Sequence, residues 1–429
     1  MNREQRLVFG LGRSGLGVLR YLKKRGLEAC FFDEMPKAEE VAEAKSLGFV
    51  FDPEPSGTPY REVVAAPGVP ITHPLLEQLR KLGAEVIGEA ELAFRTSPTP
   101  LIGITGTAGK TSCTLYTAHF LRALGFNAAA GGNVDPPLVS VIDDAEVVAV
   151  ELSSFQLERV ASFRPRVAVL LNLGTDHLDR HGGLEAYHRA KLNILKNLTS
   201  NDVVVYNAGD PNIVPAAEAS PARKAGFLPG VSPRETNLAA ARLAASAFAE
   251  LMGRSVDQKV LDLAEKTAPR PEGRFDLFAK RGDVLFIDDS IATRINAVRA
   301  ALEAAPTPVA WILGGRDKGA PVHELSDLAR AKVRLILAIG EDGPSMSRVF
   351  EGICPVTEIH QPTGRETLEQ AVTEALAKLT SGSVLLAPLG TSFDQFKDYK
   401  ERSRVFREVV FAHGAIPVEA GAGEPWISS

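Results

Sequence analysis

Short apolar runs alternate with helical patterns along most of the chain. Each run is rich in branched residues and ends in a loop of glycine or polar side chains. The clearest runs are 7–9, 101–104, 147–150, 167–171, 309–313 and 384–387. Continuous apolar strands separated by helices are typical of parallel sheets with right-handed crossovers. The pattern therefore predicts an α/β fold with mainly parallel sheets and flanking helices.

Two interruptions divide this pattern into three parts. Thr96-Ser-Pro-Thr-Pro100 has the composition of a linker, and Pro269-Arg-Pro-Glu-Gly-Arg274 separates a helical region from a new strand-rich one. Because one core seldom grows beyond about 250–300 residues, a chain of 429 residues suits several domains. We predict three α/β domains, at residues 1–97, 98–270 and 271–429.

The strongest candidate site is the glycine loop Thr105-Gly-Thr-Ala-Gly-Lys-Thr111, between a strand and a helix. Its backbone N–H groups and the helix start would surround nucleotide phosphates. Lys110 would reach the outer phosphates and Thr111 would hold Mg²⁺. The strict Walker pattern has a glycine where this chain has Ile104, so a glycine-rich turn without a ligand is the alternative. The expected nucleotide contacts are Gly106, Thr107, Gly109, Lys110, Thr111 and Ser112.

Glu151 and His177 follow the next two buried strands, 147–150 and 167–171. Since the carboxyl ends of parallel strands meet at one edge of a sheet, both side chains are expected near Lys110. A carboxylate and an imidazole beside a phosphate loop suit Mg²⁺. Each also has a structural alternative, because Glu151 could cap the next helix and His177 could be a hydrogen-bonded structural residue.

The first hundred residues carry a second glycine turn, Gly10-Leu-Gly-Arg-Ser-Gly15, between a strand and a helix. Asp33 follows the next strand, at the position where an acidic residue can bind a ribose hydroxyl. This predicts a Rossmann-like domain with a nucleotide-like ligand, of which NAD is one possibility. The turn at 66–70 also follows a strand, and is either a ligand site or a plain connection.

Several polar residues near other element ends are weaker candidates. Asn237 starts an alanine-rich helix, where a capping role and a nucleotide-base role both fit. By spacing alone, Lys191 is a solvated lysine on a surface helix. The strand-end candidates of the last third are Arg274, Asp289, Thr293, Lys318 and Ser392, each with a solvated loop as the alternative.

Composition narrows the partners and the compartment. The net charge is −5 without a run of lysine or arginine, which indicates neither nucleic acid nor a membrane surface. Cys30, Cys113 and Cys354 are isolated, as expected in a reducing compartment. The sequence shows no secretory segment and no apolar run long enough to span a bilayer. We therefore expect a cytoplasmic protein that binds small molecules and is a monomer.

Five motifs in this order resemble those of the Mur ligase family across essentially the whole chain. They are the loop at 105–111, Gly131-Gly-Asn133, Glu151-Leu-Ser-Ser-Phe-Gln-Leu-Glu158, Asp176-His-Leu-Asp-Arg180 and Asp394-Gln-Phe396. The resemblance implies a UDP-binding N-terminal domain, a central P-loop-type ATPase and a dinucleotide-fold-like C-terminal domain that binds the acceptor amino acid. The third and fifth motifs, with the first glycine turn, favour the branch that adds D-glutamate.

The resemblance also implies roles for individual residues. The UDP part of UDP-N-acetylmuramoyl-L-alanine would be held by Ser14, Asp33, Pro67 and Gly68, with Asn133 nearer the chemistry. ATP would contact Lys110, Thr111, Asn237, Arg274 and Asp289. Two Mg²⁺ ions would be bound through Thr111, Glu151, His177 and a CO₂-carbamylated Lys191. D-glutamate would be received by Thr293, Lys318, Ser392 and Phe393, with Tyr399 nearby; Lys318 would also be catalytic.

The implied reaction is an ATP-dependent amide synthesis for the peptidoglycan precursor. ATP would convert the L-alanine carboxylate into an acyl phosphate, which the amine of D-glutamate attacks. Some positions depart from the family pattern: Ala66 replaces a usual serine, Arg234 an asparagine, Gly273 a histidine and Ile291 a lysine, and Asp288 and Arg294 each replace an asparagine. Three hypotheses therefore stand: this or another amino-acid ligase of the family, an impaired nucleotide-binding homologue, and an NAD-linked oxidoreductase.

Overall fold

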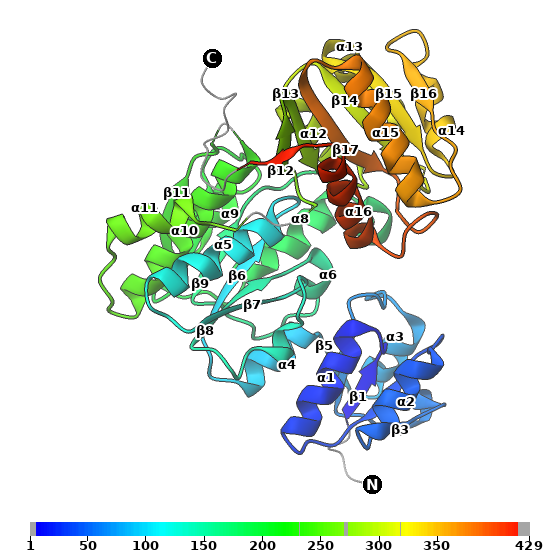
Figure 1. The fold of residues 1–429 in the computed structure, drawn as a ribbon. Helices are drawn as coiled ribbons and strands as arrows, with labels where there is room; N and C mark the ends of the chain where they lie inside the picture. The colour runs from blue at the N-terminus through cyan, green and yellow to red at the C-terminus, as the bar shows by residue number, and fades with distance from the viewer. Residues whose placement is uncertain (1–5, 231, 270–272, 318, 419–429) are drawn as a thin grey trace. The chain divides into compact units, whose positions relative to one another are not determined.

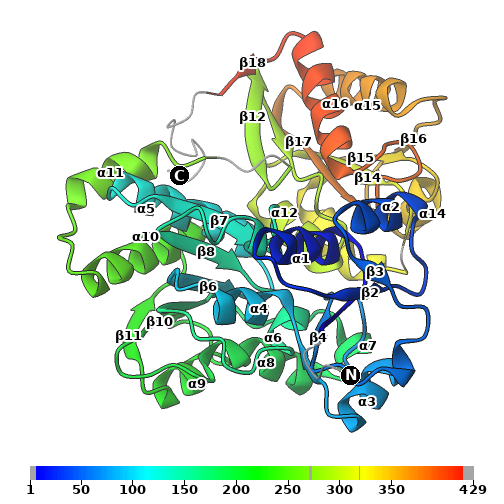
Figure 2. The ribbon, with the colours of Figure 1, turned by 90° about the horizontal axis from the view of Figure 1, so that it is seen from below.

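The structure is a computed structural model that describes residues 6–230, 232–269, 273–317 and 319–418 (Figures 1 and 2). By its internal contacts the chain separates into two compact units, Met1–Pro269 and Arg270–Ser429. The described residues form three sheets, of which two lie in the first unit and one in the second. The domain boundary expected after residue 97 lies inside the first unit and stays a prediction.

The first sheet has five parallel strands in the order β3-β2-β1-β4-β5. This order places β1 beside β4, so the loops after both strands lie at the same edge. The strands are β1 (Arg6–Phe9), β2 (Cys30–Phe32), β3 (Val50–Phe51), β4 (Glu62–Ala65) and β5 (Glu85–Ile87). The helices are α1 (Arg13–Lys24), α2 (Ala38–Ser46), α3 (Pro74–Lys81) and α4 (Glu89–Thr96), with the 3₁₀ turn η1 (Pro55–Gly57).

The second sheet has six parallel strands in the order β11-β10-β9-β6-β8-β7. The strands are β6 (Leu101–Thr105), β7 (Ala128–Gly132), β8 (Val147–Glu151), β9 (Val167–Leu170), β10 (Val203–Asn207) and β11 (Arg223–Phe227). The helices are α5 (Lys110–Ala123), α6 (Ser154–Leu157), α7 (Leu178–His181), α8 (Leu184–Leu192), α9 (Val214–Ala219), α10 (Pro233–Leu251) and α11 (Gln258–Lys266), with 3₁₀ turns η2 (Leu138–Ser140) and η3 (Asn193–Leu195). The strand β6 lies between β8 and β9, so the segments after these three strands are neighbours.

One face of this sheet is covered by α5 and α10, which lie side by side in both views (Figures 1 and 2). The contact face of α10 is made of alanines, including Ala240, Ala241, Ala244 and Ala245, which are fully buried. Small side chains let the two helix backbones approach each other closely. This packing fixes α5, whose first residue is Lys110.

The second unit holds a mixed seven-stranded sheet in the order β16-β15-β14-β17-β13-β12-β18. Five strands are parallel, β12 and β13 form an antiparallel hairpin, and β18 pairs antiparallel with β12. The strands are β12 (Asp276–Arg281), β13 (Asp283–Asp288), β14 (Val309–Gly314), β15 (Val333–Ile339), β16 (Val356–Glu358), β17 (Ser381–Leu389) and β18 (Ile416–Pro417). The helices are α12 (Ile295–Ala304), α13 (Ser326–Lys332), α14 (Gly343–Ser347), α15 (Gly364–Lys378) and α16 (Tyr399–Ala412), with 3₁₀ turns η4 (Val322–Leu325) and η5 (Arg348–Phe350).

The predicted fold class is confirmed, since the sheets are mainly parallel and their crossovers are helical. The central strands of the second and third sheets are rich in β-branched and aliphatic residues and are buried on both faces, as in β6, β8, β9 and β14. Among the described helices, none combines the length and the apolar character that crossing a membrane requires.

Candidate nucleotide and metal site

The glycine loop between β6 and α5 is held in one conformation by its surroundings. Gly109, the residue before α5, has a φ of 81°, in the left-handed region that glycine adopts without strain. A Cβ at this position would lie only 2.3 Å from the Asn237 side-chain oxygen. The loop therefore requires glycine at 109, and Asn237 lies directly against the loop.

Two lysines donate to the backbone of this loop. The Lys110 Nζ donates to the carbonyl oxygens of Gly106 at 2.9 Å and Thr107 at 3.0 Å. The Lys191 Nζ donates to the same Gly106 oxygen at 2.8 Å and lies 4.8 Å from the centre of the Tyr187 ring. Only 2% of Lys191 is exposed, so the reading of this residue as a solvated surface lysine is wrong. The helix α8 packs its Lys191 inward, against the phosphate loop.

Glu151 is the centre of a buried polar cluster at the end of β8. Its Oε2 accepts from the Thr111 hydroxyl at 2.6 Å, and its Oε1 accepts from the Asn133 amide at 2.7 Å. The register of β6 against β8 sets Ile104 opposite Glu151, which brings the carboxylate to the loop. The alternative role of Glu151 as a helix cap is wrong, because the Ser153 side chain caps α6. A hydroxyl and a carboxylate in contact are a suitable oxygen set for Mg²⁺.

Two residues that the sequence did not single out also support the loop. The Asn172 side chain accepts from the Ala108 N–H at 2.8 Å and donates to the Ala108 carbonyl at 3.1 Å. The Tyr187 hydroxyl donates to the Thr107 Oγ1 at 3.1 Å. Asn172 follows β9, the neighbour of β6, so its position at a strand end was the available signal. Nothing in the sequence pattern distinguishes Tyr187.

His177 lies at the start of the short helix α7, with a φ of 50° that is unusual for a residue with a side chain. Its ring packs edge-on against Phe155, with 4.7 Å between ring centres. Its Nε2 lies 3.6 Å from the Asp176 carboxylate. Phe155 belongs to the segment that follows Glu151, so the structure joins the His177 loop to that segment.

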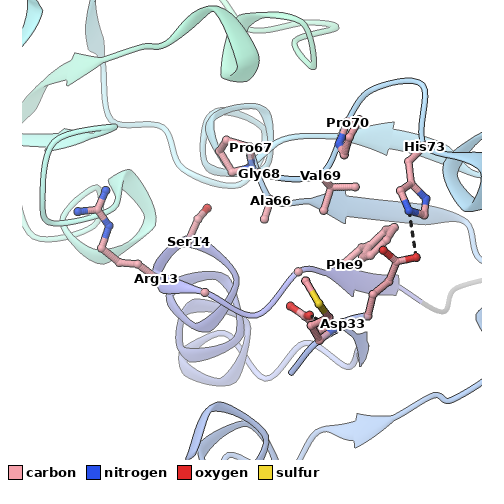
Figure 3. Close-up of a pocket in the computed structure, with 14 residues that line it drawn as sticks. Phe9, Arg13, Ser14, Asp33, Ala66, Pro67, Gly68, Val69, Pro70 and His73 are labelled. Carbon is pink, nitrogen blue, oxygen red and sulfur yellow. Dashed lines mark hydrogen bonds and ion pairs between the residues drawn. The ribbon is translucent and has the colours of Figure 1, made fainter. Parts of the chain in front are cut away.

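A cavity of about 460 Å³ opens at the carboxyl ends of β1 and β4 in the first sheet (Figure 3). Four residues expected there from the sequence line it, namely Ser14, Asp33, Pro67 and Gly68. The Asp33 carboxylate accepts from the backbone N–H groups of Leu11 at 2.7 Å and Met35 at 2.9 Å. The Ser14 hydroxyl donates to Glu89 at 2.7 Å. The glycine turn and the turn at 66–70 thus form two walls of one pocket, as Figure 3 shows.

Most candidate site residues of the second unit follow one of its parallel strands. Asp289 follows β13 and accepts from the Phe275 N–H at 3.0 Å, beside Arg274. Ser392 is buried, Thr293 and Tyr399 are half-buried, and Phe393 is 67% exposed. Lys318 lies outside the described residues.

Asp288 stands where the family pattern has asparagine, and its carboxylate forms an ion pair with Arg407 on α16. Its carboxylate accepts from the Arg407 Nε at 3.1 Å and from the Ser290 hydroxyl at 2.5 Å, and it is fully buried. The Arg407 guanidinium also pairs with Asp276 at 2.6 Å. The extra charge of Asp288 is therefore compensated inside this unit, which removes one reason to expect an impaired C-terminal domain.

Burial raises the pKa of Asp289 to about 7, and the neighbouring Asp288 adds to the rise. A carboxyl whose pKa is higher in the folded state stabilises the fold at low pH. That stability is lost as pH rises from the ordinary value of 3.8 through about 7. When the pH is lowered from 8 to 6, the free energy of unfolding should rise by about 1 kcal/mol more in the parent protein than in the Asp289→Asn variant.

Chemical unfolding followed by the fluorescence of Trp311, which is buried in the same unit, measures this difference. The comparison with the asparagine variant cancels the pH dependence of the other groups. Equal pH dependence in the two proteins would contradict the assigned shift.

Within the described ranges no group of three or more His, Cys, Asp and Glu side chains is placed to hold a metal ion. A cation at the loop would therefore take part of its coordination from elsewhere. Thr111 and Glu151 supply two protein oxygens, and phosphate oxygens of a bound nucleotide are the expected remaining ligands of Mg²⁺.

Family models match three consecutive parts of the chain. The description "Mur ligase MurD-like, N-terminal domain" matches residues 4–88, "Mur ligase middle domain" matches 104–248, and "Mur ligase, glutamate ligase domain" matches 273–388. Two relatives bear the name "UDP-N-acetylmuramoylalanine--D-glutamate ligase". The one from Thermus thermophilus is 61% identical over 99% of both chains. The one from Deinococcus radiodurans is 48% identical over 97% of this chain and 94% of its own.

Solved structures of low sequence identity share the fold. The ligase described as "MurF ligase from Thermotoga maritima in complex with ADP" is 16% identical, with a TM-score of 0.58 over 96% of this chain and 99% of its own. "Crystal structure I of MurF from Acinetobacter baumannii" is 18% identical, also with a TM-score of 0.58, over 95% of this chain and 93% of its own.

These matches define the chain as an ATP-dependent α/β ligase. It belongs to the Mur ligase family. The resemblance based on the five motifs is confirmed, and an NAD-linked oxidoreductase has no support among these relatives.

Proposed function

We propose that the chain joins D-glutamate to UDP-N-acetylmuramoyl-L-alanine in the cytoplasm, with cleavage of ATP to ADP and phosphate, during synthesis of the peptidoglycan precursor. The contact of Thr111 with Glu151 beside Lys110 carries this proposal, because it sets a metal-binding oxygen pair at the phosphate loop. The two relatives with this activity in their names support the choice of D-glutamate.

The loop fits the phosphates of ATP. The helix α5, which has 14 residues, directs the positive end of its dipole at the loop. Lys110 would leave the loop carbonyls for the outer phosphates, and Mg²⁺ would be held by Thr111 and Glu151, with His177 nearby. The cation supplies charge neutralisation while the phosphoryl group moves to the substrate carboxylate.

The chemistry needs no covalent bond to the protein. The L-alanine carboxylate takes the γ-phosphoryl group, ADP leaves, and the carbonyl carbon becomes electrophilic. The amine of D-glutamate then attacks this carbon, loses a proton and expels phosphate, which leaves an amide. Asn133 would hold the reacting end of the substrate, since its amide already contacts Glu151.

The UDP part of the substrate and D-glutamate would bind at two other places. The cavity lined by Ser14, Asp33, Pro67 and Gly68 would take the UDP part, whose ribose hydroxyls and phosphates match the carboxylate and the glycine turn. The D-glutamate contacts would come from Thr293, Ser392 and Phe393 in the second unit, near Tyr399, and Lys318 would join them. Asn237, Arg274 and Asp289 would contact ATP.

Lys191 would be carbamylated, and its new carboxylate would support the metal site. The burial of Lys191 and its position at the phosphate loop, where its Nζ donates to the Gly106 carbonyl, support this role, because lysine is rarely so fully buried. Lys191→Ala should lower kcat by at least about 100-fold, and added acetate or formate should restore part of it.

Lys196→Ala is the matched control, since Lys196 is an exposed lysine just beyond α8. It should keep the activity of the parent with and without carboxylates. A Lys191→Ala variant as active as the parent would refute the carbamate role.

The proposed function is tested by ADP release with UDP-N-acetylmuramoyl-L-alanine and each amino acid in turn. Release should require the UDP substrate and D-glutamate together. Turnover with a different amino acid would reassign the acceptor. ATP binding without turnover on any amino acid would indicate the impaired homologue.

A further inference from the structure

The turn 66–69, which lines the cavity of the first sheet, is held from behind by two arginines of the second sheet's domain. The buried Arg159 donates to the Ala66 carbonyl at 3.2 Å and to the Val69 carbonyl. Arg180 donates to the Pro67 carbonyl at 2.5 Å and to the Val69 carbonyl at 3.1 Å. Neither arginine lines the cavity. We call Arg159 and Arg180 the turn clamp.

The clamp satisfies three carbonyl oxygens of one short turn. Because these oxygens point at guanidinium groups, they are not presented to an anionic ligand in the cavity. The pKa of Arg159 is lowered to about 10, mainly by burial; Glu158 opposes the shift, and the nearby Arg180 and Arg80 add to it. The protein thus keeps two cations close together behind the turn, at a cost in desolvation that an anion in the cavity would offset.

Arg180 also contacts the segment that follows Glu151. Its guanidinium carbon lies 4.0 Å from the centre of the Phe155 ring. The same ring is stacked on His181, with centres 5.0 Å apart and planes at 7°, and it receives the edge of His177 at 4.7 Å. The His181 ring is held by two contacts, since its Nε2 lies 2.9 Å from the Ser154 hydroxyl and its Nδ1 lies 2.6 Å from the Glu158 carboxylate. Phe155 therefore joins the pocket turn to the His177 loop.

The backbone at His177 shows why this support matters. A φ of 50° and a ψ of 34° lie in the left-handed region, which is strained for a residue with a side chain and persists only when the surroundings enforce it. The enforcing contacts are those on Phe155 and in α7, the helix that carries Arg180. Whatever stabilises the turn clamp consequently stabilises the conformation of His177.

We propose that Arg180 is a positioning residue that couples the nucleotide-sugar pocket to the phosphate loop. A uridine diphosphate in the cavity fixes the turn, the turn fixes Arg180, and Arg180 with Phe155 orders the His177 loop. Gly174 of this loop donates its N–H to the Thr107 Oγ1 of the phosphate loop at 2.9 Å. ATP then binds more tightly, because the His177 loop, which contacts the phosphate loop, is already ordered. This proposal rests on the proposed function, because it takes UDP as the occupant of the cavity.

Calorimetry with UDP and the magnesium complex of a non-hydrolysable ATP analogue tests the coupling. UDP lacks the N-acetylmuramoyl sugar and the reacting carboxylate, so it reports on the pocket without reaching the phosphate loop. In the parent, saturating UDP should tighten binding of the analogue by about tenfold, and the analogue should tighten UDP equally. In Arg180→Ala, this factor should fall below about twofold, although each ligand still binds alone.

Two further variants separate coupling from simple destabilisation. Phe155→Leu keeps the apolar volume and the Arg180 hydrogen bonds, but removes the ring; it should also lose the coupling. Arg20→Ala removes an arginine of α1 whose partner is Glu43, on the exposed surface, and should keep the parent's factor. Hydrogen exchange of residues 174–183 should slow on UDP addition in the parent and in Arg20→Ala, but not in the other two variants.

The outcomes distinguish this proposal from the function it rests on. A parent that binds neither UDP nor the UDP substrate would refute the proposed function and the coupling together. A parent that binds both ligands with independent affinities would refute the coupling alone. Coupling that persists in both Arg180→Ala and Phe155→Leu would show that Arg180 does not transmit it.

Discussion

Lys110→Ala should lower kcat for ADP release by at least about 10³-fold, the largest effect on activity that we expect of any single substitution. Lys110 is the first residue of α5, and its Nζ donates to two carbonyls of the glycine loop in the structure. Removing this lysine leaves the charge on the transferring phosphoryl group without its ammonium partner. Steady-state kinetics with saturating ATP measure the loss.

Lys224→Ala is the control for this substitution. The Lys224 Nζ also donates to a backbone carbonyl, that of Ser220 at 2.5 Å, but it lies on β11 at the edge of the same sheet. Its loss should change kcat by less than about twofold, as expected for a surface substitution. A Lys110→Ala variant within tenfold of the parent would mean that the phosphoryl group is not transferred at this loop.

Gly15→Ala should cause the largest loss of stability, at least about 3 kcal/mol in the first sheet's domain. A Cβ at this position would lie 1.9 Å from the Gly10 carbonyl oxygen and 2.9 Å from its carbon. Both are backbone atoms, so α1 can accept the methyl group only by moving away from β1. The cavity depends on this contact, because Gly10 and Ser14 line it. Chemical unfolding and the KM for the UDP substrate should both report the damage.

Gly57→Ala provides the comparison, since nothing lies within 4 Å of a Cβ there. It should change the unfolding free energy by no more than about 0.5 kcal/mol and leave the KM unchanged. Gly15→Ala with the stability of the parent would contradict the close approach of α1 to β1.

Local patterns in the sequence were sufficient to predict the fold class and the position of Glu151 beside the loop. Glu151 could be placed because the register of adjacent parallel strands brings their ends together, and its strand ends where the loop of β6 begins. In a parallel sheet, ligands bind at the carboxyl ends of the strands. Alternation of strands and helices along the sequence indicates such a sheet, so the binding edge could be predicted.

Contacts made by docked helices could not be predicted in the same way. Lys191 is buried because α8 packs against the loop 85 residues earlier in the chain. The pairing of Asp288 with Arg407 spans 119 residues, and the contact of Arg180 with Pro67 spans 113. Such contacts depend on how helices and domains pack, and no local periodicity encodes them.

The account depends on phosphoryl transfer from ATP to the substrate carboxylate at the Lys110 loop. Its most direct test is a single turnover with UDP-N-acetylmuramoyl-L-alanine labelled with ¹⁸O in the L-alanine carboxylate, together with D-glutamate and unlabelled ATP. If an acyl phosphate forms, one ¹⁸O atom moves from the carboxylate into the released phosphate. Phosphate that is free of the label, in a reaction that still yields the amide, would contradict it.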